Sequence, residues 1–140
     1  METYIFRILT AAVVGYLIGL INFKHAPVKM FSIICMGAAL VSITSTEFFK
    51  LLDLPWSSDP GRLTAQVISA LGFIGSGLIW IGGRHETEGL SIVANLWITA
   101  IIGILLGIGL EVISVICLIL IIIIFYGPDC IERYKEQKDN

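Results

Sequence analysis

The stretch from Asp59 to Gly77 reads "DPGRLTAQVISALGFIGSG" and decides how the rest of the chain is interpreted. It opens with an acid, an arginine and a glutamine, and it continues as an apolar segment with several glycines and serines. Asp59 followed by Pro60 is typical of a helix start, because the carboxylate can accept hydrogen bonds from free backbone N–H groups and proline lacks an N–H. The stretch therefore predicts a helix that carries polar side chains in its first turns.

The composition of the chain indicates that this helix lies in a membrane. Of the 140 residues, 56% are hydrophobic and 14% are charged, and the mean hydropathy is +0.91. A soluble domain of this length buries too small a fraction of its surface to hide so much apolar area. The net charge of −2 does not suggest a strongly charged partner. We therefore expect an integral membrane protein in contact with lipid, and no nucleic-acid partner.

The apolar runs are long and do not alternate, which predicts helices that cross the membrane. A helix needs about 20 residues to cross about 30 Å of hydrocarbon. The run from Leu90 to Tyr126 has 37 residues. As one helix it would extend about 55 Å, so we expect it to fold back at "GIGLE", Gly107 to Glu111. A four-span bundle, with the first segment lying in the membrane interface, is the alternative to five spans.

The predicted fold class is an all-α, polytopic transmembrane helical bundle. Residues 1–127 form the membrane domain, and residues 128–140 form a short cytoplasmic tail. The five expected spans lie at about residues 5–23, 28–49, 63–81, 90–108 and 112–126.

Lysines and arginines in the short loops set the expected orientation, because cytoplasmic loops carry an excess of them. With five spans, six lie on one side, namely Lys24, Lys29, Arg84, Arg133, Lys135 and Lys138. Three lie on the other side, namely Arg7, Lys50 and Arg62. We therefore expect the N-terminus outside and the C-terminus in the cytoplasm.

Arg62 and Gln66 lie four residues apart, so they share one face of the expected third helix. The same face continues with small or polar residues and one aromatic residue: Ala65, Ser69, Gly72, Phe73 and Ser76. In lipid, small side chains let helices approach closely, and polar side chains hydrogen-bond across the contact. We therefore expect the third helix to be the central one, with this face covered by its neighbours.

Two other helices offer surfaces that match such a face. The first contains Gly15 and Gly19, four residues apart. The fourth carries small and polar residues at steps of four: Ser91, Asn95, Thr99, Gly103 and Gly107. We expect these glycines to make helix contacts. Asn95, close to Trp97, is the most notable polar group of the fourth span; packing is its expected role, and a substrate or ion contact is the alternative.

No group of residues has the spacing of an enzyme's catalytic site. The glycines of "GFIGSG" lack the GxGxxG spacing, and no histidine lies within a span to activate Ser76. Cys35, Cys117 and Cys130 show neither CxxC nor Cys/His metal spacing. We expect no enzyme activity, no cofactor and no metal. Three acids could meet a hard cation such as Mg²⁺, although solvation is their expected role: Glu47, Asp53 and Asp59.

The quoted stretch resembles the MgtC/SapB family of bacterial membrane proteins. The resemblance extends to "EGLSIVANLWITAIIGILLGIG" in the fourth span, "VGYLIGL" in the first and "CMGAAL" in the second. The Asp-Pro-x-Arg opening, the Ala-Gln pair, the Gly-Phe-x-Gly-x-Gly core and the Leu-Trp-x-x-Ala-x-x-Gly run follow in the same order. The resemblance covers nearly all of the spanning region. It does not include the soluble C-terminal extension that some members carry, so we infer no regulatory domain.

The resemblance implies which residues matter and where the protein acts. It singles out Asp59, Arg62, Gln66, Gly72, Gly75, Gly77, Asn95, Leu96, Trp97 and Cys35. It also implies a bacterial inner membrane, a link to low Mg²⁺ and virulence in hosts, and action on membrane partners such as the proton-translocating ATP synthase.

Two functions stay open at this point. One is a regulator that acts through helix contacts with a membrane partner or with a second copy of itself in a homodimer. The other is an ion or small-solute transporter or channel subunit, for example for Mg²⁺, in which Arg62, Gln66 and Asn95 face a cavity. Charged side chains are sparse within the spans, and an ion path needs buried carboxylates or a polar row. The sequence therefore favours the regulator.

Overall fold

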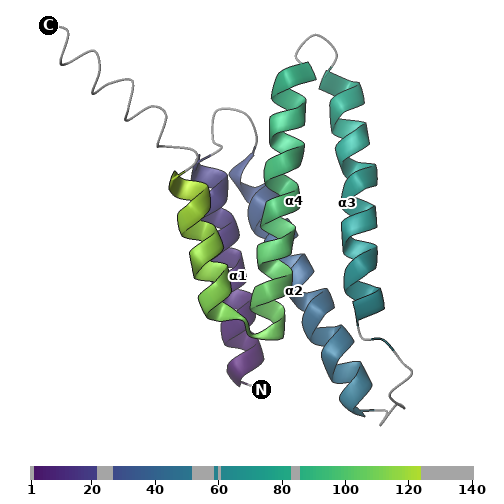
Figure 1. Ribbon diagram of the computed structural model, residues 1–140, viewed down its shortest axis with the longest axis vertical. Coiled ribbons are helices and arrows are strands. Elements are labelled where there is room, and N and C mark those ends of the chain that lie inside the picture. Colours follow the sequence, from purple (N-terminus) through teal and green to yellow (C-terminus); the bar gives the residue numbers. More distant parts are fainter. Residues whose placement is uncertain (1, 22–26, 52–58, 60, 83–85, 124–140) are drawn as a thin grey trace, which may run out of the picture.

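The computed structural model describes residues 2–21, 27–51, 59, 61–82 and 86–123, which form a helical bundle (Figure 1). The long helices are α1 (Glu2–Ile21), α2 (Val28–Leu51), α3 (Gly61–Gly82) and α4 (Glu86–Ile108), and a shorter apolar helix follows at Glu111–Ile123. The four long helices are each long and apolar enough to cross a membrane. The prediction of an all-α, polytopic transmembrane bundle is confirmed.

Each helix overlaps the span that the sequence predicts. In Figure 1, α1 runs alongside α4 instead of lying across one end of the bundle, and α2 crosses obliquely behind α4. The end of the fifth predicted span and the tail at 128–140 lie outside the described residues.

The long apolar run reverses at the predicted "GIGLE" segment. Gly109 has a φ of 96°, a conformation that favours glycine because it has no Cβ. The Gly109 N–H donates to the Leu106 carbonyl at 3.1 Å, and the Leu110 N–H donates to the Leu105 carbonyl at 2.9 Å. This pair of bonds is a Schellman motif, which satisfies the last carbonyl groups of α4. A local glycine motif therefore ends α4 and turns the chain into the next helix.

The centre of the bundle is made by α2 and α4. Each of them contacts the other and also α1 and α3, whereas α1 and α3 do not meet. In Figure 1, α3 lies at one edge of the bundle. The expectation that the third helix is the central one is therefore wrong.

Glycines set the closest approach of α1 and α4 to α2. A Cβ atom added at Gly15 would lie 2.7 Å from the Cβ of Cys35 and 2.7 Å from the Phe31 carbonyl oxygen. At Gly103 it would overlap the Cys35 carbonyl oxygen. Cys35 is fully buried and lies against Gly15 of α1 and Gly103 of α4. Such close backbone contact is what small residues provide between membrane helices. Two further buried glycines lie one turn along the same helices: Gly19 and Gly107.

Serine hydroxyl groups of α2 also hydrogen-bond to these neighbours. Ser32 Oγ donates to the Ala12 carbonyl of α1 at 2.8 Å, and Ser42 Oγ donates to the Ile104 carbonyl of α4 at 3.2 Å. Both acceptors are backbone groups on other helices. The small and polar residues of α2 are therefore used inside the bundle, which explains its central place.

Candidate functional site

The polar face of α3 points away from the rest of the chain. Six residues at steps of four and three fall within about 80° of the helix circumference, and all six are exposed: Arg62, Gln66, Ser69, Phe73, Ser76 and Trp80. We call these six residues the α3 stripe. Phe73 is 83% exposed and Trp80 is 88% exposed. The expectation that helices of the same chain cover this face is therefore wrong.

The opposite, aliphatic face of α3 packs inward instead. Leu71 lies about 180° from the stripe, is 7% exposed and clusters with Ala38 of α2 and Ala100 of α4. Val67 packs against the same cluster. Lipid is as apolar as a leucine-rich interior, so hydrophobicity alone does not turn a helix face inward. The alanines of α2 and α4 accommodate branched side chains of α3, and this fit decides which face is buried.

The three glycines of the α3 motif have different surroundings. A Cβ atom added at Gly75 would lie 2.6 Å from Val93 Cγ1 of α4, whereas one added at Gly72 or Gly77 would meet nothing within 4 Å. Among these three, packing against the described residues therefore requires a small residue at Gly75 only. Gly72 is exposed beside the stripe, and no described residue lies close enough to require its small size.

The polar side chains of the α3 stripe differ in whether they have a hydrogen-bond partner among the described residues. Ser69 Oγ donates to the Ala65 carbonyl at 3.4 Å, and Ser76 Oγ donates to the Phe73 carbonyl at 2.8 Å. Gln66 has no side-chain hydrogen bond to any residue that the structure describes. An amide in an apolar medium without a partner costs about 2–7 kcal/mol. Gln66 is therefore the residue of the stripe that most needs a partner.

Asp59 begins α3 as the sequence predicts, since its Oδ1 accepts a hydrogen bond from the Gly61 N–H at 2.8 Å. Arg62 follows on the first turn, and both residues are exposed. Their side chains form no ion pair with each other, and the Arg62 guanidinium has no hydrogen bond or ion pair with any other described residue. Apart from the capping bond of Asp59, an acid and a base at the same end of α3 thus have no side-chain partner among the described residues.

The predicted residues of α4 divide between the interior and the surface. Asn95 is 8% exposed and Thr99 is fully buried. Thr99 Oγ1 donates to the Asn95 carbonyl at 2.6 Å, and Trp97 is 41% exposed. Arg62 and Gln66 are exposed on the outer side of α3, so the structure does not bring them together with Asn95.

A cavity of about 230 Å³ lies between α2, α3 and α4. Four of its lining residues carry hydroxyl groups, and none is charged. The lining residues are Ser42, Ser45, Thr46, Gly61, Thr64 and Ile108. Atoms exposed to this cavity are mostly apolar, because Ser42, Thr46 and Thr64 donate their hydroxyl groups to backbone carbonyls. It also lacks the carboxylates that a hard cation prefers.

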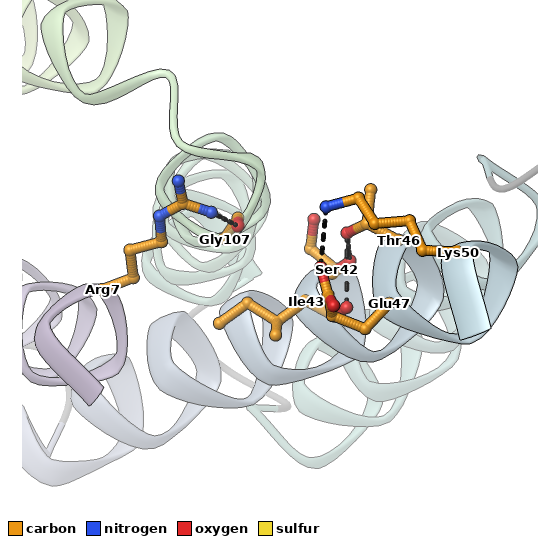
Figure 2. Close-up of polar contacts among 7 residues, drawn as sticks. All are labelled: Arg7, Ser42, Ile43, Thr46, Glu47, Lys50 and Gly107. Carbon is orange, nitrogen blue, oxygen red and sulfur yellow. Dashed lines mark hydrogen bonds and ion pairs between the residues drawn. The ribbon is translucent and has the colours of Figure 1, made fainter. Parts of the chain in front are cut away.

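Arg7 has a role that the sequence interpretation missed. Its Nη1 donates to the Gly107 carbonyl at 3.1 Å, which links α1 to the last turn of α4 (Figure 2). The last carbonyl groups of a helix lack helical partners and carry partial negative charge, so a cation stabilises them. The sequence pattern that could have predicted this contact is an arginine in the first span, on the same side of the membrane as the glycine-rich end of the fourth span.

The three acids considered for a cation have other roles or lie outside the described residues. Glu47 pairs with Lys50 at 2.8 Å on the exposed side of α2 (Figure 2). Asp59 caps α3, and Asp53 lies outside the described residues. Within the described part of the chain, no three histidine, cysteine, aspartate or glutamate residues are grouped to hold a metal ion.

Comparison with known proteins identifies the family. The MgtC family model matches residues 8–134. A protein of Haemophilus influenzae, named only as uncharacterized, is 33% identical over an alignment of 138 residues that covers 94% of this chain and 58% of that protein. The protein of Escherichia coli K12 named putative magnesium transporter YhiD is 36% identical over an alignment of 112 residues that covers 76% of this chain and 52% of that protein.

A protein of Salmonella typhimurium LT2 named MgtC is 35% identical over an alignment of 113 residues that covers 78% of this chain and 45% of that protein. The chain spans about half the length of these curated relatives. No solved structure matches it. The family match covers most of the chain and agrees with the apolar helices, so this chain belongs to the MgtC family of multi-pass bacterial membrane proteins.

Proposed function

We propose that this protein is a regulatory factor in adaptation to low magnesium or host stress, and that it acts through helix contacts within the membrane. The observation that carries the proposal is the exposed α3 stripe, in which Arg62 and Gln66 have no partner among the described residues. A face with polar side chains and small neighbours is suited to another helix, because the partner can supply hydrogen bonds and approach closely.

The interior of the bundle also supports a regulator over a conduit. Gly15 and Gly103 lie so close to α2 that an added Cβ would meet backbone atoms. The buried polar residues of the described part are uncharged: Ser42, Ser45, Asn95, Thr99 and Ser114. Paths for protons or cations usually carry ionisable groups or rings of oxygen ligands. The helices described are thus packed for mutual contact.

The proposed partner is a membrane complex of the inner membrane, with the proton-translocating ATP synthase as the first candidate. The resemblance of the motif in α3 to the MgtC/SapB family suggests this partner and the link to low magnesium. The distribution of lysine and arginine supports an N-terminus outside and a C-terminus in the cytoplasm. In that orientation Arg62 and the start of α3 lie near the outer surface.

The test is a purification from bacteria grown at low Mg²⁺. We expect the tagged chain to recover the ATP synthase, or another membrane complex, in a fixed ratio. The variant Gln66→Leu should recover less of it, whereas Leu9→Ala should not change recovery, because Leu9 is 59% exposed on α1, away from α3. Recovery of no membrane complex, or equal recovery with both variants, would contradict the proposal.

Transport of a small solute is the second candidate. It is favoured by the cavity of about 230 Å³ between α2, α3 and α4 and by the name of the relative described as a putative magnesium transporter. The discriminating assay is Mg²⁺ uptake into proteoliposomes that contain only this purified chain. Robust uptake that is lost in the Ser42→Val variant would establish transport and overturn the regulator.

A further inference from the structure

We propose that the α3 stripe is the interface of a homodimer, in which α3 of a second copy packs in parallel against α3 of the first. The inference rests on the stripe being a contact face, as proposed above, and names the molecule that covers it. The membrane complex would then contact another surface of the dimer, and Gln66→Leu would lower its recovery by weakening the dimer.

The spacing of the stripe fits a pair of helices. Its residues follow one another at steps of 4, 3, 4, 3 and 4, which is the spacing of a left-handed helix pair. Ser69 stands at the middle of the stripe, and Ala65 and Gly72 flank it on the exposed side. These small residues allow two backbones to approach closely at the centre of the contact.

The stripe is also complementary to itself, as a two-fold interface requires. With every copy inserted in the orientation proposed above, a two-fold axis along the membrane normal makes the two α3 helices parallel and places Gln66 opposite Gln66. A glutamine side chain carries both donors and an acceptor, so two of them can hydrogen-bond to each other. The amide that lacks a partner among the described residues gains one from the same residue of the second copy.

Charge complementarity at the start of α3 favours the same arrangement. Arg62 and Asp59 are three residues apart, which is an offset of about 4.5 Å along a helix axis. An extended arginine side chain can bridge that offset to Asp59 of the second copy. Because the interface is symmetric, the pair forms twice. Arg62 and Asp59, which form no ion pair with any described residue, thus become partners across the contact.

A lipid molecule satisfies fewer of these groups than a second copy does. A headgroup phosphate could pair with Arg62 in the first turn of α3. It would repel Asp59, and Gln66 lies about 6 Å deeper along the helix, where acyl chains offer no hydrogen bond. A second copy supplies an acid, a base and an amide at matching depths.

The first test is disulfide crosslinking in native membranes. Cys117 and Cys130 are replaced by serine, and the buried Cys35 is kept. In this background Ser69→Cys should give a covalent dimer on mild oxidation. Leu9→Cys is the matched control, since Leu9 is exposed at a similar distance from the start of α1, and it should crosslink at least about tenfold less. Equal crosslinking at both positions would overturn the inference.

The second test exchanges charges between copies. A copy with Arg62→Asp presents two acids, and a copy with Asp59→Arg presents two cations, so each should repel itself. We expect the self-association constant of each to fall about tenfold, which corresponds to about 1.4 kcal/mol, and the mixed pair to recover. Recovery of the mixture also shows that both variants fold. Equal association in every combination would overturn the inference.

These outcomes separate the dimer from the proposed function. A chain that stays monomeric in lipid at all protein densities, yet recovers the ATP synthase, overturns the dimer and leaves the regulator in place. A dimer through α3 that recovers no membrane complex and transports Mg²⁺ supports the interface and contradicts the regulator.

Discussion

Adding one methyl group at Gly103 should push α4 away from α2. The Cβ of an alanine at this position would overlap the Cys35 carbonyl oxygen and lie 3.0 Å from the Cβ of Ala38. Favourable contacts between non-bonded carbon atoms lie at about 3.5–4.0 Å. The obstacle is the backbone of α2, which has no rotamer to change. The two helices must therefore separate along their contact or tilt.

The expected magnitude comes from comparing two alanine substitutions. Overpacking of a tightly packed core costs about 1–3 kcal/mol, and replacing a helical glycine with alanine gains about 1 kcal/mol of helix propensity. Gly37 is the matched control, because it lies within α2 and an added Cβ would meet nothing within 4 Å. The propensity gain is common to both variants and cancels. Gly37→Ala should therefore be more stable than Gly103→Ala by about 1–3 kcal/mol.

The assay is reversible unfolding in mixed micelles, in which a denaturing detergent is titrated and helical content is followed by circular dichroism. Gly37→Ala should unfold at or above the wild-type midpoint, and Gly103→Ala should unfold at a lower detergent fraction. If Gly103→Ala were as stable as Gly37→Ala, the close approach of α4 to α2 would be refuted.

Three further predictions follow from the ends of the helices. Arg7→Met should lower the free energy of unfolding by about 1–2 kcal/mol, because the Gly107 carbonyl loses a charged donor. The control Lys50→Met, which removes an exposed ion pair, should leave the free energy of unfolding unchanged. Equal effects of the two substitutions would contradict the capping of α4 by Arg7. Gly109→Ala should lower the midpoint of thermal unfolding, because a φ of 96° disfavours a residue with a Cβ. Gly109→Asn should lower this midpoint less. An unchanged midpoint for Gly109→Ala would contradict the positive φ at this turn. In spheroplasts, a membrane-impermeant maleimide should label Lys50→Cys and not Lys29→Cys, and the reverse pattern would invert the proposed orientation.

Part of the candidate site could be predicted from local sequence. Asp59 caps α3 as the Asp-Pro pair indicates, and the residues of the stripe share one face because helical spacing fixes it. The contact of Arg7 with the Gly107 carbonyl could not be predicted from local sequence, since the two residues are 100 positions apart. Such a contact depends on which helices are neighbours.

By itself, the sequence determined that the chain is a bundle of apolar helices and that the long apolar run reverses at "GIGLE". Bilayer thickness sets the length of a span, and the reversal after α4 is encoded locally by Gly109, whose positive φ suits a residue without a Cβ. These features need no knowledge of neighbours, so composition and spacing were sufficient to predict them.

Only the tertiary structure decided which face of α3 turns inward and which helix lies at the centre. In water a polar face would turn outward, but in lipid both faces of a helix meet apolar surroundings, so polarity does not determine the side. The choice depends on shape. Gly103 and Cys35 bring α4 and α2 into close contact, and Leu71 then packs against the alanines of both helices. The polar stripe is consequently left on the outside, because the neighbours that could have covered it are already packed against each other.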